Sequence, residues 1–270
     1  MNVCYINHRN EKIDLNSDDI VLKYHEFYDY SWDADTSNNR IIGFSRTSST
    51  IPVTVTICPD TWEEFREISE RFHDIIETDI VSLIPGKLYV GEYYLKCYIS
   101  GDKKSDAFMG VPIQVKNLTV VTDHPHWIHE DMYSFKTTDI TSSNNKLYPY
   151  KYAYRYANGL SSTSIVNANF KECNFKMIIY GPVTKPQVII GGYKYFIDII
   201  LEDGEYLEID SVENTVTKVM ATGIRVNCFH NRSKSNSVFR PIQTGRQDIS
   251  WSGKFDFDIV ILQERSEPRW

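Results

Sequence analysis

The segment DHPHWIHED, residues 123–131, concentrates three histidines and three carboxylates in nine positions. In an extended chain His124 and His126 project to the same side, and His129 could join them across a turn. Three imidazole nitrogens form a donor set that zinc accepts. The helical H-E-x-x-H arrangement is absent, however, so the segment is a weak metal-site candidate. We expect no bound metal and no cofactor, and we interpret the histidines as surface or interface residues.

Other catalytic patterns are weaker still. The sequence has no G-x-S-x-G elbow, no cysteine beside a plausible local base, and no glycine-rich phosphate-binding motif. Two facing carboxylates would be enough for a glycosidase, and the C-terminal half offers five that no motif excludes. These are Asp198, Glu202, Glu205, Asp256 and Asp258. The last two alternate with apolar residues, as on the solvated face of a strand, so we expect no enzyme activity.

Composition indicates an ordered, mainly β protein. The chain has 270 residues, of which 13% are aromatic, including 18 Tyr, and aromatic residues favour strands. Its net charge of -7 argues against a surface that grips nucleic acid, because phosphate neutralisation needs clustered Lys and Arg. With no 18-residue apolar run, we expect a soluble chain without membrane anchoring. Five widely spaced cysteines predict buried thiols rather than disulfides or a zinc ribbon.

One helix stands out in the N-terminal half. Apolar residues recur at steps of three and four from Trp62 to Ile76, and Thr61 with Glu64 makes a capping box. This pattern predicts a helix at about 61–77. Before it, IPVTVTI (51–57) alternates apolar and Thr residues, which is typical of a half-buried strand.

The C-terminal half has the rhythm of an antiparallel β-sandwich. Residues 136–146 are polar and without periodicity, which predicts a linker between a domain at 1–135 and one at 147–270. Strand-like runs then follow, separated by Gly, Pro and Asn, and Asp203-Gly204 predicts a tight hairpin. Five tyrosines alternate at the start of this half, and an extended chain would place all five rings on one face. They are Tyr148, Tyr150, Tyr152, Tyr154 and Tyr156. Such a face either packs on a neighbour or forms a platform for stacking sugars.

Several further motifs run in order along the chain. They are RIIGFSRTSSTIPVTVTI (40–57), TWEEF (61–65), PGKLYVGEYYLKCYI (85–99), TDHPHWIHED (122–131), IIYGPVTKPQVIIGGYKY (178–195), SVFRPIQTGRQDISWSGKFDFDI (237–259) and QERSEPRW (263–270). In this order they resemble the distal tail protein family of long-tailed (siphovirus-type) bacteriophages and prophages. The resemblance covers nearly the whole chain, and the closing block is its most specific part.

The resemblance implies a fold and a function. It implies an α+β N-terminal domain with one helix, which forms a homohexameric ring, and a C-terminal galectin-like antiparallel β-sandwich. Such a ring joins the tail tube protein to tail-tip and receptor-binding proteins, with DNA only in transit through the lumen. The expected location is the virion tail, assembled in the cytoplasm of a bacterial host. Galectin-like describes a shape, so sugar binding does not follow from it.

Two further expectations concern particular residues. Pro125 and Trp127 match the family motif, so we expect them to close the first domain by packing at its junction. We hypothesise that the end of the chain leaves the sandwich and that Trp270 docks on a hydrophobic surface near Trp127. The alternative function is a virion carbohydrate-binding module that contacts the host cell wall through the alternating tyrosines.

Overall fold

The computed structural model describes residues 2–107, 110–137 and 164–269 and divides into two compact units. Unit 1 comprises residues 1–129 and 264–270, and unit 2 comprises residues 130–263. Strands β10 (Trp127–Phe135) and β21 (Phe257–Arg265) each have residues in both units. Most of the expected linker, 136–146, lies outside the described residues.

Unit 1 is built around one long strand, β8 (Tyr93–Ala107). Its first part pairs with β7 and its second part with β9, so β8 belongs to two antiparallel sheets. One sheet runs β2-β1-β7-β8-β10 and the other runs β3-β6-β9-β8. The other strands of this unit are β1 (Val3–Ile6), β2 (Lys12–Asp14), β3 (Ile20–His25), β4 (Asp33–Ser37), β5 (Arg40–Ser45), β6 (Ser49–Ile57), β7 (Gly86–Val90) and β9 (Gln114–Thr122). In β6 the alternation expected from the sequence is confirmed, because its four apolar residues are buried.

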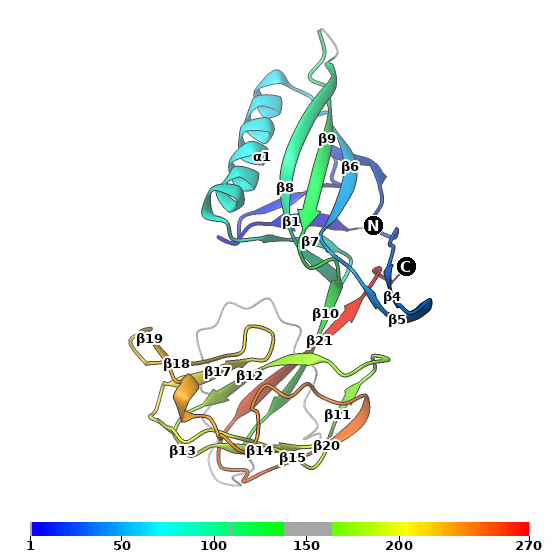
Figure 1. Ribbon diagram of the computed structural model, residues 1–270. Helices are drawn as coiled ribbons and strands as arrows, with labels where there is room; N and C mark the ends of the chain where they lie inside the picture. Colours follow the sequence, from blue (N-terminus) through cyan, green and yellow to red (C-terminus); the bar gives the residue numbers. More distant parts are fainter. Residues whose placement is uncertain (1, 108–109, 138–163, 270) are drawn as a thin grey trace. The chain divides into compact units, whose positions relative to one another are not determined.

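Helix α1 (Trp62–Ser82) lies along these sheets, as Figure 1 shows. Both halves of the capping box form: the Glu64 N–H donates to the Thr61 hydroxyl (3.2 Å), and the Thr61 N–H donates to the Glu64 carboxylate (3.1 Å). The helix ends at Ser82 rather than near residue 77. The apolar pattern fails to predict this last turn because the residue it buries there is Asp79.

Asp79 is fully buried and joins the helix to the first strands. Its carboxylate accepts hydrogen bonds from the Tyr5 hydroxyl (2.5 Å) and the His8 backbone N–H (2.9 Å), and it contacts the His8 ring Nδ1 (2.6 Å). Burial and the bond to Asp79 raise the pKa of Tyr5. Gly86 closes the site, since a Cβ there would lie 2.4 Å from the Tyr5 hydroxyl. Every oxygen of the buried carboxylate therefore has a partner, which is the condition for burying a charge.

Unit 2 contains two antiparallel sheets and a short two-stranded one. The first runs β19-β18-β17-β12-β21-β10, the second runs β11-β20-β14-β15, and β13 pairs with β16. The strands not yet bounded are β11 (Ser164–Asn167), β12 (Asn174–Tyr180), β13 (Val183–Thr184), β14 (Gln187–Ile190), β15 (Tyr193–Phe196), β16 (Ile200–Leu201), β17 (Tyr206–Asp210), β18 (Thr215–Val219), β19 (Arg225–Asn227) and β20 (Gly245–Trp251). A 3-10 turn, η1 (Phe229–Asn231), follows β19.

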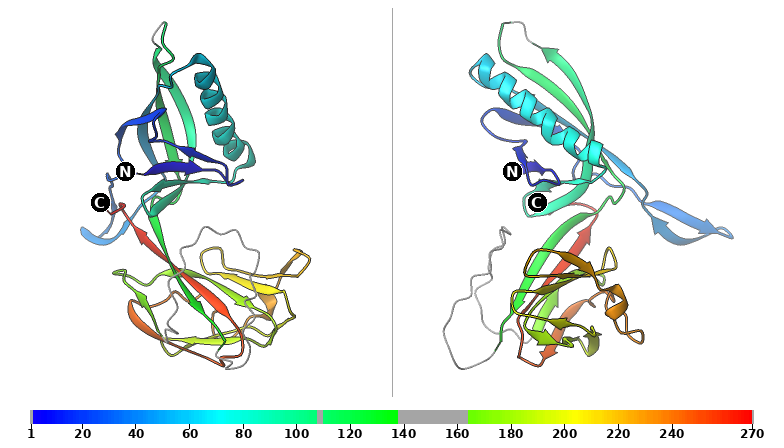
Figure 2. Two further views of the ribbon diagram at one scale, coloured as in Figure 1. Left: turned by 180° about the vertical axis from the view of Figure 1, so that it is seen from behind. Right: turned by 90° about the vertical axis from the view of Figure 1, so that its left-hand side faces the viewer.

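The two larger sheets of unit 2 share one hydrophobic core. Phe175 and Met177 reach it from β12, whereas Val188 and Ile249 reach it from β14 and β20. The sheets lie as two layers in Figure 2. The expectation of a mainly β chain with antiparallel sheets is therefore confirmed. No helix in the described part of the chain is long and apolar enough to cross a membrane.

Two glycine-containing turns of unit 2 connect their flanking strands in different ways. Gly191 and Gly192 both have positive φ, 55° and 79°, and they join β14 to β15 as a tight hairpin. Gly204 also has a positive φ, but the turn at Asp203-Gly204 is not the hairpin that the sequence predicted. It joins β16 to β17, which pair with different strands. The dipeptide predicts the turn correctly, but it carries no information on which strands will pair.

Candidate functional site

Strands β4 and β5 form a hairpin that stands alone in unit 1. They pair with each other and with no other described strand. Almost every residue of both strands is exposed. In the right-hand view of Figure 2 the hairpin projects away from the rest of the unit. A two-stranded sheet of this kind gains little stability by itself, because nothing covers its faces.

The register gives the hairpin one apolar and one polar face. Residues paired across an antiparallel ladder lie on the same face, and Ala34 is paired with Phe44. A bulge between Asp35 and Thr36 shifts the register so that Thr36 is paired with Ile41, which brings Ile41 to the face of Phe44. The three remaining pairs, on the opposite face, are polar. They are Asp33 with Ser45, Asp35 with Gly43, and Ser37 with Arg40.

The apolar face is exposed although it has the composition of a core face. The exposed fractions are 60% for Ile41, 70% for the bulged Ile42 and 59% for Phe44. The sequence reasoning missed this hairpin, although a signal was present. Asn38 and Asn39 both have positive φ, 50° and 59°, which a two-residue type I′ turn requires and which asparagine tolerates well.

The foot of the hairpin meets the histidine-rich segment. The His126 ring makes an edge contact with Trp32, with centroids 6.1 Å apart. The Arg46 guanidinium lies over the Trp32 ring at 5.5 Å and over Tyr30 at 5.9 Å, and burial lowers the pKa of Arg46. The segment therefore supports the base of the hairpin through aromatic contacts.

The three histidines do not gather around one point. The His124 and His126 rings lie 4.7 Å apart, and His124 Nε2 contacts Glu264 Oε1 at 3.1 Å. His129 instead lies 3.5 Å from the Glu92 carboxylate. Among the described residues, no group of three or more His, Cys, Asp or Glu side chains could hold a metal ion.

Pro125 and Trp127 are both buried in unit 1. The Trp127 side chain is 2% exposed and packs edge-on against Phe27, at a centroid distance of 5.8 Å. Trp270 and the five alternating tyrosines, Tyr148 to Tyr156, lie outside the described residues.

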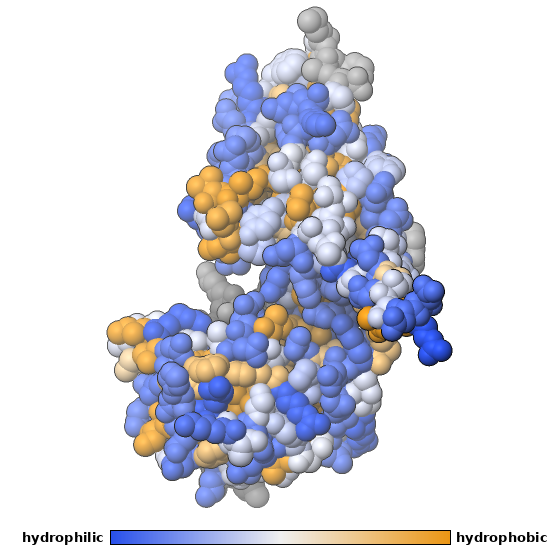
Figure 3. Space-filling model, in the orientation of Figure 1, coloured by the Kyte–Doolittle hydropathy of each residue, from blue (hydrophilic) through white to orange (hydrophobic). Residues whose placement is uncertain are grey.

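A second exposed apolar patch lies at the C-terminal end of α1. Val81 is 82% and Leu83 is 80% exposed, and Ile80 and Ile84 are also exposed. Figure 3 shows the patch as an orange area over the lower end of the helix. Leu83 is the helix C-cap and has a positive φ of 52°, a conformation that usually selects glycine. A leucine in this position adds local strain and leaves its own side chain in water.

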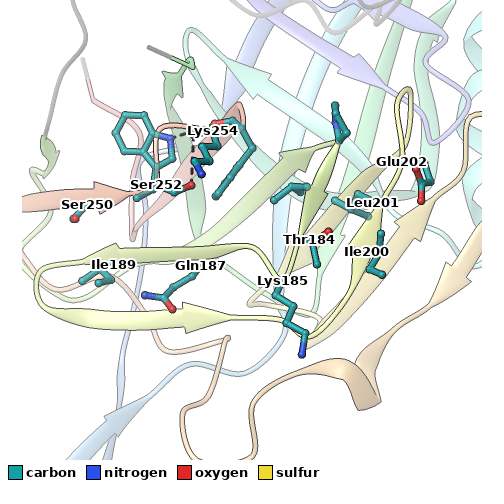
Figure 4. A pocket seen from close by; sticks show the side chains of 14 residues that line it. Thr184, Lys185, Gln187, Ile189, Ile200, Leu201, Glu202, Ser250, Ser252 and Lys254 are labelled. Atoms are coloured by element: carbon teal, nitrogen blue, oxygen red, sulfur yellow. Dashed lines mark hydrogen bonds between the residues drawn. The ribbon is translucent and has the colours of Figure 1, made fainter. Parts of the chain in front are cut away.

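Unit 2 has an open groove of about 780 Å³ between its β13–β14 and β20–β21 turns. Figure 4 shows its polar rim, which includes Lys185, Gln187, Ser250 and Lys254. Trp251 also lines it, but its indole N–H donates to the Phe255 carbonyl (3.2 Å). The groove has the polar and aromatic character of a shallow ligand site.

Most of the five candidate carboxylates have structural partners. Glu205 binds Lys218 at 2.6 Å, Asp198 binds Lys185 at 3.3 Å, and Asp258 accepts a hydrogen bond from the Tyr180 hydroxyl (2.7 Å). Burial acts to raise the pKa of Glu205, but the Glu202 N–H and Lys218 outweigh it and lower the pKa. Asp256 accepts from the Thr137 N–H, and Glu202 is exposed at the groove. Four of the five carboxylates therefore have a structural partner, and Glu202 is the fifth.

The fold is similar to that of solved phage tail structures. The crystal structure of the Dit (gp 19.1) protein of phage SPP1, described as a paradigm of the hub adsorption apparatus in phages that infect Gram-positive hosts, aligns with a TM-score of 0.58 at 10% identity. That alignment covers 97% of this chain and 99% of the SPP1 chain. A chain of the phage p2 baseplate, in its activated conformation with strontium, aligns with a TM-score of 0.61 at 13% identity and covers 99% of both chains. No protein-family model and no curated protein matches the sequence.

Proposed function

We propose that this chain is a distal tail protein, a structural component of a phage tail tip or baseplate. The observation that carries the proposal is the likeness to the SPP1 Dit protein over both units, which covers 97% of this chain and 99% of that one. The sequence motifs support the same family independently, since they extend from residue 40 to residue 270. At 10% to 13% identity the likeness concerns the fold, so the function is inferred.

In this role the chain works by assembly. Unit 1 forms a homohexameric ring that joins the tail tube protein to tail-tip and receptor-binding proteins, and unit 2 is a galectin-like sandwich that projects from it. DNA passes through the lumen without being held, which suits a chain with a net charge of -7. The protein belongs to the virion tail and is assembled in the cytoplasm of the bacterial host.

Size-exclusion chromatography with light scattering on the full chain tests this proposal. The expected species has six times the 31.4 kDa mass of one chain and appears as a ring in negative stain. Because a tail partner could be needed to close the ring, the measurement is repeated with the neighbouring tail proteins. A strict monomer at high concentration in both cases would contradict the proposal.

A second candidate function is a carbohydrate-binding module, which the groove beside Trp251 favours. Its rim supplies hydroxyl, amide and ammonium groups that could bind sugar hydroxyls. A glycan array with the full chain tests it, with Gln187→Ala for the groove and Tyr150→Ala with Tyr154→Ala for the tyrosine face. Binding that is lost in one of these variants would support the second function, and no binding at millimolar sugar would exclude it.

A further inference from the structure

The β4–β5 hairpin and the end of α1 are two exposed apolar surfaces of the same unit. The hairpin surface consists of one face with Ala34, Thr36, Ile41 and Phe44, together with the bulged Ile42. The helix-end patch consists of Ile80, Val81, Leu83 and Ile84. The two surfaces lie on opposite sides of unit 1 in the left-hand view of Figure 2. One surface cannot cover the other within a single copy.

Each surface departs from local expectation in a way that exposes apolar side chains. The bulge in the hairpin turns Ile41 to the same face as Phe44, where no core lies beneath it. At the helix end, Leu83 occupies a left-handed C-cap that would favour glycine, and its side chain remains exposed. Neither feature buries an apolar side chain within the unit. Such exceptions to local preference are expected where the exposed side chains contact another molecule.

The charges at the two surfaces are complementary. Asp74, Glu77 and Val81 share one face of α1, being spaced by three and four residues, and the last turn of the helix has no basic residue. The negative end of the helix dipole therefore adds to two exposed carboxylates, of which Glu77 also contacts His73 Nε2 at 3.1 Å. The hairpin turn carries Arg40, which is exposed and makes no ion pair among the described residues.

We infer that the hairpin of one copy docks on the helix end of a second copy, with Arg40 beside Asp74 and Glu77 of its neighbour. This inference deepens the proposed function and rests on it. Because the two contacting surfaces differ, the contact is head-to-tail, and repeating it by rotation closes a ring rather than a symmetric pair. Covering the apolar face would also supply the stability that an isolated hairpin lacks.

The first test places a charge in the contact. Ile42→Asp and Val81→Asp are each expected to raise the apparent dissociation constant for ring assembly by about 30-fold or more, the size expected for a central interface residue. Both side chains are exposed, so the variants should melt like the wild type. Ser48→Asp is the matched control, because it adds the same charge at an exposed position outside the hairpin and should leave the ring intact.

The second test distinguishes a head-to-tail contact from a symmetric one. In a Cys58→Ser background, where the other native cysteines are buried, Ile42→Cys and Val81→Cys chains are treated with a short bismaleimide. A cross-linked dimer is expected when the two variants assemble together and not when either assembles alone. Dimers from Ile42→Cys chains alone would overturn the inference in favour of a hairpin-to-hairpin contact.

The outcomes separate this inference from the proposed function. If the wild type forms rings and Ile42→Asp forms them equally well, the docking is wrong while the distal tail function stands. If the wild type forms no ring with or without its tail partners, the proposed function fails and the docking fails with it.

Discussion

At the scale of single residues, Asp79 places a fully buried carboxylate inside unit 1. A fully buried carboxylate is tolerated only when donors surround it, and here Tyr5 and His8 supply them. The three groups come from α1, β1 and the turn after β1, so the interaction fixes the helix to the sheet at a position where the apolar pattern is interrupted.

Replacing Asp79 by alanine should lower the free energy of unfolding of unit 1 by about 2 to 4 kcal/mol. The loss arises because the His8 N–H loses its acceptor and the buried Tyr5 hydroxyl keeps only the longer contact with the Cys97 carbonyl (3.3 Å). Urea denaturation measures the change, with Glu70→Ala on the exposed face of the same helix as the control. Equal effects of the two substitutions would contradict the role given to Asp79.

His25 should make unit 1 sensitive to acid. Its ring stacks on Phe27 with centroids 4.4 Å apart, and burial lowers its pKa, which Asp29 opposes in part. The folded state therefore favours the neutral ring, whereas the unfolded chain titrates at about 6.5. As the pH falls below that value, the unfolded state binds the proton more readily and the free energy of unfolding decreases.

Denaturation of His25→Phe at several pH values measures this contribution. The variant keeps a stacking ring without a titrating group, so its stability should fall less steeply with acid than that of the wild type. His73→Gln, on the exposed face of α1, should behave like the wild type. If the free energy of unfolding of His25→Phe fell with decreasing pH as steeply as that of the wild type, other groups would cause the acid sensitivity.

At the scale of elements, the start of α1 depends on its capping box. Thr61→Ala removes the acceptor for the Glu64 N–H and should cost about 1 kcal/mol, while Thr61→Ser should retain most of the stability. Hydrogen exchange of the first-turn amides provides a local measurement. Exchange that is as slow in Thr61→Ala as in the wild type would show that the cap contributes nothing.

The sequence predicted elements where a local pattern determined them. The start of α1 was predictable because capping is local, whereas its end was not, because Asp79 is stabilised by residues more than seventy positions away. The apolar strands were likewise predictable from alternation. The β4–β5 hairpin was missed because its bulge interrupts the alternation, leaving only the Asn38-Asn39 turn as a signal.

The candidate site was predictable only in part. DHPHWIHED was predicted to be a packing segment, and its Trp127 is buried. That the same segment lies at the foot of an exposed hairpin depends on Trp32, which is distant in the sequence. The helix-end patch carries no sequence signal at all, because exposed apolar residues after a helix resemble the start of a strand.

At the scale of the whole molecule, the segment after β21 contributes to unit 1. Residues 264–270 belong to that unit, and Pro268 is buried. Deleting residues 266–270 should therefore lower the free energy of unfolding of unit 1 by about 1 to 3 kcal/mol and weaken ring assembly. Thermal denaturation and light scattering measure the two effects. Removing Trp270 alone then tests its expected docking, and no change in either quantity would contradict that docking.

The division of unit 1 into two stretches of chain has a consequence for synthesis. A ribosome must translate all of residues 130–263 before the Glu264 segment emerges, so unit 2 is the first unit whose residues are all available to fold. Residues 1–129 are translated earlier, but until then unit 1 lacks the contacts of the Glu264 segment. If the inferred docking needs a complete unit 1, the order of residues delays assembly until the Glu264 segment has emerged.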